Sequence, residues 1–132
     1  MVETIRSFPY FSQGVSAGFA SPADDYETDN LNLNDYVINN ETATFFVRVK
    51  GDSMKDANVL DGDILVIDRS LPATHGKIVV AFYNGDFTVK RLYKKDIIKL
   101  VPENKKYPEI IIEDIDDFSI WGVVTYIVHK AR

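Results

Sequence analysis

Ser53 lies in the tetrapeptide Gly51-Asp52-Ser53-Met54, between a predicted strand over residues 44–50 and a predicted helical turn over residues 55–60. Backbone N–H groups at the start of a helical turn have no partner within the turn, so they can receive an oxyanion beside a serine nucleophile. The same position also suits a serine whose hydroxyl only caps the turn. Taken alone, the tetrapeptide leaves both readings open and favours the cap.

A serine nucleophile needs a base, for which Lys90 and the histidines His75 and His129 are the candidates. His75 lies in a Thr-His-Gly loop and His129 in the basic C-terminal tail. Neither has the local sequence of a hydrolase histidine, so a turn residue and an exposed tail residue are the expected readings. Two distant histidines without any cysteine also provide no ligand set for a metal, and none is expected.

Lys90 is the other possible base, as in the Ser-Lys variant of nucleophilic catalysis. The strand pattern of residues 86–93 places Lys90 on the same face as Thr88 and Leu92, toward apolar surroundings. A free lysine titrates near about 10.4, and only burial would lower that value enough for a base at neutral pH. The alternative is an edge-strand lysine that discourages sheet-to-sheet aggregation. In isolation the pattern favours this alternative.

The segment Ser16-Ala17-Gly18-Phe19 has the character of a protease substrate. Its small residues would not obstruct attack on the backbone, and the surrounding residues show neither helical nor strand periodicity for long. Residues 1–30 are therefore expected to form a flexible N-terminal arm, and residues 31–132 the folded domain.

Composition restricts the classes of protein to consider. The chain has 132 residues, with 15 Lys and Arg against 20 Asp and Glu, which gives a formal net charge of -5. This charge repels a phosphate backbone, so little direct DNA binding is expected. The absence of cysteine excludes disulfides and suits a reducing compartment. No apolar run approaches the roughly 20 residues of a membrane span and no signal peptide is evident, so a cytoplasmic protein is expected.

The elements that would position Ser53 and Lys90 are mostly strands. A short helix is expected at residues 31–38, followed by strands at residues 44–50, 64–68, 77–83, 86–93, 97–101, 109–113 and 120–128. Asn84-Gly85 is a strong hairpin signal, because both residues tolerate positive φ. The pattern predicts a single mostly β domain of twisted antiparallel sheets.

The order and spacing of these features resemble one family, the LexA/UmuD group of self-cleaving Ser-Lys proteins, also called the S24 peptidases. The resemblance covers nearly the whole chain and rests on the stretches Phe8 to Ser12, Ala17 to Tyr26, Gly51 to Met54, Asp61 to Asp63, Ser70 to Gly76, Phe87 to Lys90 and Gly122 to Val124. The 37 positions from Ser53 to Lys90 and the 35 from Gly18 to Ser53 fit the family layout.

The resemblance implies a role for each candidate residue. Ser53 would be the nucleophile and Lys90 the neutral general base. The backbone N–H groups of Asp52 and Ser53 would form the oxyanion hole, and the bond cut would join Ala17 to Gly18. Some relatives have Cys at the position of Ala17, whereas others have the same Ala-Gly pair.

The resemblance also implies partners and a biological role. The protein would be a homodimer whose self-cleavage is stimulated by the RecA filament on single-stranded DNA. The cleaved form would be the accessory subunit of an error-prone translesion DNA polymerase in the SOS response. No cofactor is implied.

Two other functions compete with this one. One is a transcriptional repressor, LexA-like or of the phage type, with the same protease core. Only 17 residues precede the proposed cut, however, which is too short for a helix-turn-helix module. The other is an inert β-rich binding module, in which Ser53 is a cap and Lys90 a surface residue.

Overall fold

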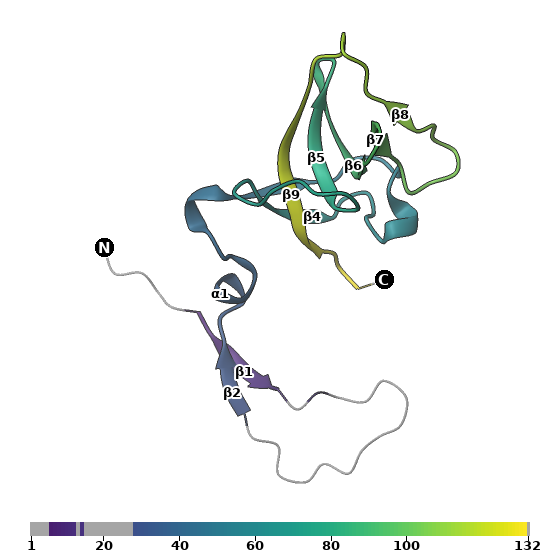
Figure 1. Ribbon diagram of the computed structural model, residues 1–132. Helices are drawn as coiled ribbons and strands as arrows, with labels where there is room; N and C mark the ends of the chain where they lie inside the picture. The colour runs from purple at the N-terminus through teal and green to yellow at the C-terminus, as the bar shows by residue number, and fades with distance from the viewer. Residues whose placement is uncertain (1–5, 13, 15–27, 132) are drawn as a thin grey trace. The chain divides into compact units, whose positions relative to one another are not determined.

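The structure is a computed structural model that describes residues 6–12, 14 and 28–131 (Figure 1). Ala17 and Gly18, the proposed cleavage site, lie outside the described residues. The chain divides into two compact units, Met1–Asn39 and Asn40–Arg132. Among the described residues, no helix combines the length and apolar character that crossing a membrane requires.

The first unit contains two short strands that the sequence pattern does not predict. Strand β1 (Phe8–Phe11) pairs antiparallel with β2 (Thr28–Leu31), so that Phe8 lies opposite Leu31. Helix α1 (Leu33–Val37) follows within the predicted range of 31–38. It begins at Asn32, whose side chain accepts a hydrogen bond from the N–H of Asn34 and so caps the helix.

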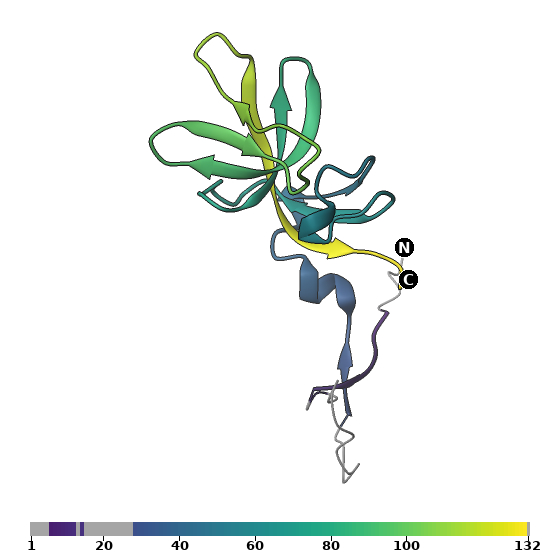
Figure 2. The same cartoon turned by 90° about the vertical axis from the view of Figure 1, so that its right-hand side faces the viewer.

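The second unit is a seven-stranded antiparallel sheet in the order β3-β4-β9-β5-β6-β7-β8. Its strands are β3 (Thr44–Arg48), β4 (Ile64–Asp68), β5 (Ile78–Tyr83), β6 (Asp86–Lys94), β7 (Ile98–Val101), β8 (Ile110–Ile111) and β9 (Phe118–Val128). Two short 3₁₀ helices, η1 (Glu41–Ala43) and η2 (Lys55–Ala57), accompany them. The expectation of a mostly β domain of twisted antiparallel sheets is confirmed, and the twist is visible in Figure 2.

The hairpin between β5 and β6 turns where the sequence predicts it. Asn84 and Gly85 have φ values of 46° and 97°, in the left-handed region that a two-residue turn of this kind requires. The turn brings Val79 opposite Lys90 in the β5–β6 ladder. The register of β6, and with it the direction in which the Lys90 side chain leaves the strand, is thus fixed locally.

Strand β9 joins the two halves of the sheet. It is the last strand in chain order, yet it lies between β4 and β5 and pairs with both (Figures 1 and 2). Gly122 of β9 passes against β4 so closely that an added Cβ would lie 2.4 Å from the Cγ2 atom of Ile67. In the hydrogen-bonded order of the sheet, β9 therefore stands between the β3–β4 pair and the β5–β6 pair.

Two apolar clusters form the core of this unit. The first includes Val49, Met54, Val59, Leu65, Ile67 and Val80, and the second Val79, Ala81, Leu92, Leu100 and Val123. Met54 is only 2% exposed, so the residue next to Ser53 is anchored in the core. Burial of a side chain of this size contributes about 1.5–3 kcal/mol relative to exposure, which fixes the position of the loop.

Candidate active site

The loop that carries Ser53 follows β3 and is held at several points along its backbone. Gly51 has a φ of 93°, a conformation that side chains rarely adopt, and its N–H donates to the carboxylate of Asp61 at 2.7 Å. The sulfur of Met54 accepts from the N–H of Glu103 at 3.3 Å. The turn at Gly51 thus fixes the backbone before Ser53, and the packing of Met54 fixes the backbone after it.

Ser53 does not cap the helical turn that follows it. The N-cap of η2 is Met54, and no side-chain hydrogen bond caps this helix. The cap reading, which the tetrapeptide alone favours, is therefore wrong in this structure. The Ser53 hydroxyl instead lies 3.2 Å from the Nζ atom of Lys90, within hydrogen-bond distance.

Lys90 is one of the few charged residues buried in the domain. Its side chain leaves β6, which lies between β5 and β7, and the residue is only 8% exposed. Burial lowers the pKa of Lys90 below its ordinary value of 10.5, because the ammonium ion loses its solvation. The alternative of an exposed edge-strand lysine is wrong, and the predicted inward position is correct.

Three oxygen atoms surround the Lys90 amine. They are the hydroxyl oxygen of Ser53 at 3.2 Å, that of Thr88 at 2.5 Å and the carbonyl oxygen of Val89 at 3.2 Å. A neutral amine has two N–H donors and one lone pair. If Thr88 and Val89 accept the two donors, the lone pair faces the hydroxyl of Ser53, which is the arrangement that a general base requires.

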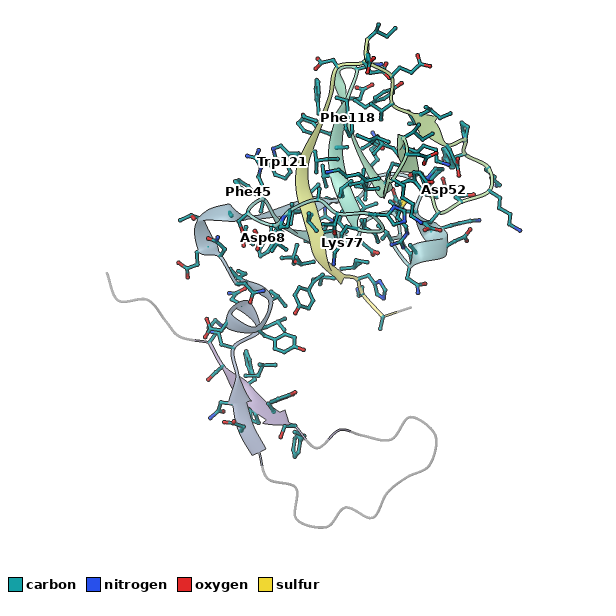
Figure 3. The ribbon with its side chains drawn as sticks, viewed as in Figure 1. Phe45, Asp52, Asp68, Lys77, Phe118 and Trp121 are labelled. Carbon is teal, nitrogen blue, oxygen red and sulfur yellow. The ribbon has the colours of Figure 1, made fainter. Side chains whose placement is uncertain are left out.

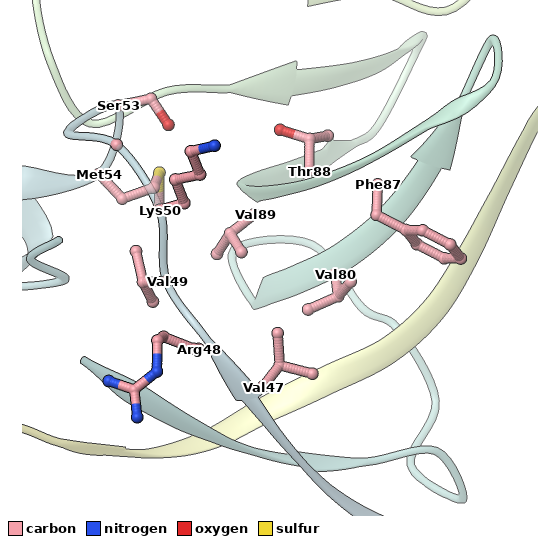
Figure 4. A pocket seen from close by; sticks show the side chains of 11 residues that line it. Val47, Arg48, Val49, Lys50, Ser53, Met54, Val80, Phe87, Thr88 and Val89 are labelled. Carbon is pink, nitrogen blue, oxygen red and sulfur yellow. The ribbon is translucent and has the colours of Figure 1, made fainter. Parts of the chain in front are cut away.

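A cleft of 230 Å³ opens beside Ser53. It is lined from one side by the end of β3 and the loop that follows, and from the other side by β5 and β6. The lining residues are 47–51, Ser53, Met54, Val80 and 87–89. In Figure 4 the hydroxyl oxygens of Ser53 and Thr88 point toward the same gap. Ser53 is thus accessible from the cleft although Lys90 is buried.

An apolar hollow of 280 Å³ adjoins the cleft. It is lined by Val47, Val80, Phe87 and Trp121, of which all but Trp121 also line the cleft. The rings of Phe45 and Phe87 both contact Trp121 edge-on, and Phe45 and Trp121 lie together in Figure 3. The hollow offers apolar surface to a substrate side chain, whereas the cleft itself is partly polar.

The two histidines are engaged elsewhere. The Nδ1 atom of His75 accepts from the N–H of Lys94 at 3.0 Å, as expected for a turn residue. The Nδ1 atom of His129 lies 3.5 Å from a carboxylate oxygen of Asp63. Within the described residues, the polar side-chain contact of Ser53 is to Lys90 and not to a histidine. In the part of the chain that the structure describes, no group of three His, Cys, Asp or Glu residues is arranged to hold a metal ion.

A loop after β7 supports the nucleophile loop from the other side, and the sequence gives no signal of this. The side-chain amide of Asn104 donates to the carbonyl oxygen of Asp52 at 2.8 Å, and the hydroxyl of Tyr107 donates to the Asp52 carboxylate at 2.6 Å. The hydrogen bond from Tyr107 is the main cause that lowers the pKa of Asp52. These contacts span 52 and 55 positions, so only the folded chain reveals them.

Comparison with known proteins identifies the family. A family model described as Peptidase S24-like matches residues 9–125. The chain belongs to the peptidase S24-like family. It is 49% identical to the protein MucA of Salmonella typhimurium over 123 residues, which cover 92% of this chain and 84% of MucA. It is also 46% identical to SamA of Salmonella typhimurium strain LT2 and 44% identical to ImpA of Escherichia coli, each over 94% of this chain and 86% or 85% of the relative.

The chain is therefore UmuD-like, and the S24 family to which it belongs consists of serine proteases. It is a self-cleaving protein of SOS mutagenesis. Its similarity to UmuD-like proteins implies the UmuD family role with a translesion polymerase. The resemblance seen in the sequence is therefore confirmed.

Proposed function

We propose that Ser53 and Lys90 are the catalytic dyad and that they cut the bond between Ala17 and Gly18 in the chain's own N-terminal segment. The observation that carries the proposal is the buried Lys90 amine, 3.2 Å from the hydroxyl of Ser53. Burial favours the neutral amine, and an open cleft beside Ser53 gives a peptide access to the nucleophile.

The reaction proceeds through an acyl-enzyme. The neutral amine of Lys90 takes the hydroxyl proton as the Ser53 oxygen attacks the carbonyl carbon of Ala17, and the N–H groups of Asp52 and Ser53 receive the oxyanion. Lys90 then returns the proton to the nitrogen of Gly18 as the peptide bond breaks. Residues 1–17 stay bound to Ser53 as an ester until Lys90 activates a water molecule that hydrolyses it.

The chain length between the two sites permits this reaction. As a flexible chain, the 35 positions from Gly18 to Ser53 would span roughly 30 Å, and the ordered elements β2, α1, η1 and β3 occupy part of this stretch. That reach suffices for cleavage within one chain and equally for cleavage between the two chains of a homodimer. Substrate and catalyst can therefore belong to the same polypeptide.

We further propose that a RecA filament on single-stranded DNA stimulates cleavage in the cytoplasm. Such a partner acts by binding the conformer with the N-terminal segment in the cleft more tightly than the undocked conformer. The 17 residues removed contain Glu3 and Arg6 as their only charged side chains, so the product keeps a formal charge of -5. The product differs in exposed surface, and this difference favours binding to the catalytic polymerase subunit.

Intact mass tests the proposed cut. The purified protein is incubated across neutral to alkaline pH, with and without RecA, single-stranded DNA and nucleotide, beside Ser53→Ala and Lys90→Ala variants whose folding is checked by circular dichroism. The expected result is loss of residues 1–17 from the parent alone, faster as pH rises and Lys90 loses its proton. The inert binding-module reading would replace the proposal if the parent stayed whole under every condition, or if folded variants were cut as fast as the parent.

A further inference from the structure

Asn104 is a buried polar side chain outside the dyad, with an exposure of only 5%. Its Nδ2 atom donates to the carbonyl oxygen of Asp52 at 2.8 Å, and its Oδ1 atom accepts from the N–H of Lys106 at 3.0 Å. One end of the amide thus faces an acceptor and the other a donor. This pairing determines the orientation of the Asn104 amide, since a flipped amide would lose both bonds.

The Asp52 carbonyl is held from two directions. Besides the amide of Asn104, the backbone N–H of Lys55 donates to the same oxygen at 3.2 Å, as part of the turn that follows. Met54 lies between Asp52 and Lys55 in sequence and is buried in the core. The carbonyl therefore cannot rotate without the loss of a hydrogen bond to a buried amide, which has no solvent nearby to replace its partner.

Holding a carbonyl also holds the next N–H group. The described residues contain no cis peptide bond, and in a trans peptide plane the N–H of residue 53 points opposite to the C=O of residue 52. Ser53 lines the cleft, whereas Asn104 and Asp52 do not. With the Asp52 carbonyl turned toward Asn104, the Ser53 N–H is turned away from Asn104.

The Ser53 N–H is also available to a ligand. In the described part of the chain, no backbone or side-chain atom accepts a hydrogen bond from it. Backbone donors without a partner are uncommon in folded proteins and suggest a partner that arrives later. At this position the later partner is the oxygen of an attacked carbonyl.

We infer that Asn104 is a positioning residue of the self-cleavage reaction, which fixes the Asp52–Ser53 peptide plane so that the Ser53 N–H faces the oxyanion. The inference rests on the proposed function, because it assumes that Ser53 is the nucleophile. A peptide plane in a turn can rotate about its flanking bonds, and rotation would replace the donor by a carbonyl oxygen that repels the oxyanion. The amide of Asn104 prevents this rotation before the reaction begins, so the donor is already in place when charge develops.

The test compares Asn104→Ala with Tyr107→Phe in the full-length chain. Tyr107 belongs to the same loop, but its hydroxyl binds the Asp52 carboxylate and leaves the carbonyl untouched. Self-cleavage rates are measured by intact mass as a function of pH, and folding by thermal melts. Loss of an oxyanion donor typically costs about 10²–10³-fold in rate, and loss of its restraint alone should cost somewhat less, about 10–100-fold.

The expected result is a plateau rate about 10–100-fold lower for Asn104→Ala, a midpoint of the pH profile equal to that of the parent, and a clearly smaller loss of rate for Tyr107→Phe. An unchanged midpoint separates an effect on the oxyanion from an effect on Lys90. A plateau equal to the parent's, or a lower rate explained by a shifted midpoint, overturns the inference while the proposed function stands. Failure of the parent to cut itself refutes the proposed function instead.

Nuclear magnetic resonance gives a readout that does not depend on cleavage. In a Lys90→Ala background, which keeps the chain whole, Asn104→Ala should shift the carbonyl carbon of Asp52 and the amide proton of Ser53, whereas Tyr107→Phe should leave both nearly unchanged. If Asn104→Ala does not fold, Asn104→Asp replaces it in both experiments, because it keeps the size and the acceptor for Lys106 but has no N–H. Unmoved Asp52 and Ser53 signals in a folded variant would contradict the inference.

Discussion

Thr88 provides the shortest hydrogen bond to the Lys90 amine, 2.5 Å between Nζ and Oγ1, and Thr88→Val removes it with little change in volume. The substitution affects both protonation states of Lys90. The ammonium form loses an acceptor, which disfavours charge, and the surroundings become more apolar, which disfavours charge further. The neutral form loses one of the two acceptors that direct its lone pair toward Ser53.

The size of the effect follows from these two losses. A hydrogen bond that involves a charged group contributes about 1.5–3 kcal/mol and a neutral one about 0.5–1.5 kcal/mol, so the ammonium loses about 1 kcal/mol more than the amine. The pKa of Lys90 should therefore fall further below its ordinary value. The neutral amine loses about 1 kcal/mol of orienting interaction, which lowers the plateau rate roughly fivefold.

The assay is the pH profile of self-cleavage in the full-length chain, followed by intact mass. Thr88→Val should have its midpoint at lower pH than the parent and a lower plateau, so the two profiles approach each other near neutral pH. Thr88→Ser, which keeps the hydroxyl, is the matched control and should follow the parent. A midpoint that stays in place or moves to higher pH would refute the reasoning that Thr88 stabilises the charged lysine.

Two further predictions concern stability. Folding lowers the pKa of Lys90, so between the lowered pKa and 10.5 the unfolded chain binds more protons than the folded chain, and the free energy of unfolding should rise with pH in this range. Urea denaturation from neutral pH to about pH 9.5 should show this rise for Ser53→Ala but not for the double variant Ser53→Ala, Lys90→Met. Parallel pH curves for the two variants would contradict the prediction. Gly122→Ala should lower the free energy of unfolding by about 1–3 kcal/mol, because the new Cβ would lie 2.4 Å from Ile67 and 3.2 Å from Arg69. A loss below about 0.5 kcal/mol in the same urea assay would show that β4 and β9 separate easily at this point.

The sequence predicts the inward position of Lys90 because this position depends on local patterns. Strand alternation places Lys90 inward, and the Asn84-Gly85 turn sets the register of the strand that carries it. The order of the strands is not predictable in this way. Local patterns predict a strand at residues 120–128, but only packing decides that the strand formed there, β9, lies between β4 and β5.

The supporting loop could not be found from the sequence for a related reason. Asn104 and Tyr107 lie between predicted strands, where a polar loop is the ordinary expectation. Their importance comes from contacts with Asp52, more than 50 positions earlier in the chain. The pairing of β1 with β2 is likewise a contact between two four-residue segments, each too short for a periodic signal.

The position of β9 affects the stage of translation at which the site around Ser53 and Lys90 can form. Ser53 follows β3 and Lys90 lies on β6, and β9 stands between the two strand pairs that carry them in the order of the sheet. During translation the chain emerges N-terminal end first, so Ser53 and Lys90 leave the ribosome before β9 does. A nascent chain without residues 118–128 lacks the strand that pairs with both β4 and β5, so the sheet that places Ser53 3.2 Å from Lys90 is incomplete. We therefore expect the proposed self-cleavage to begin only after β9 has joined the sheet.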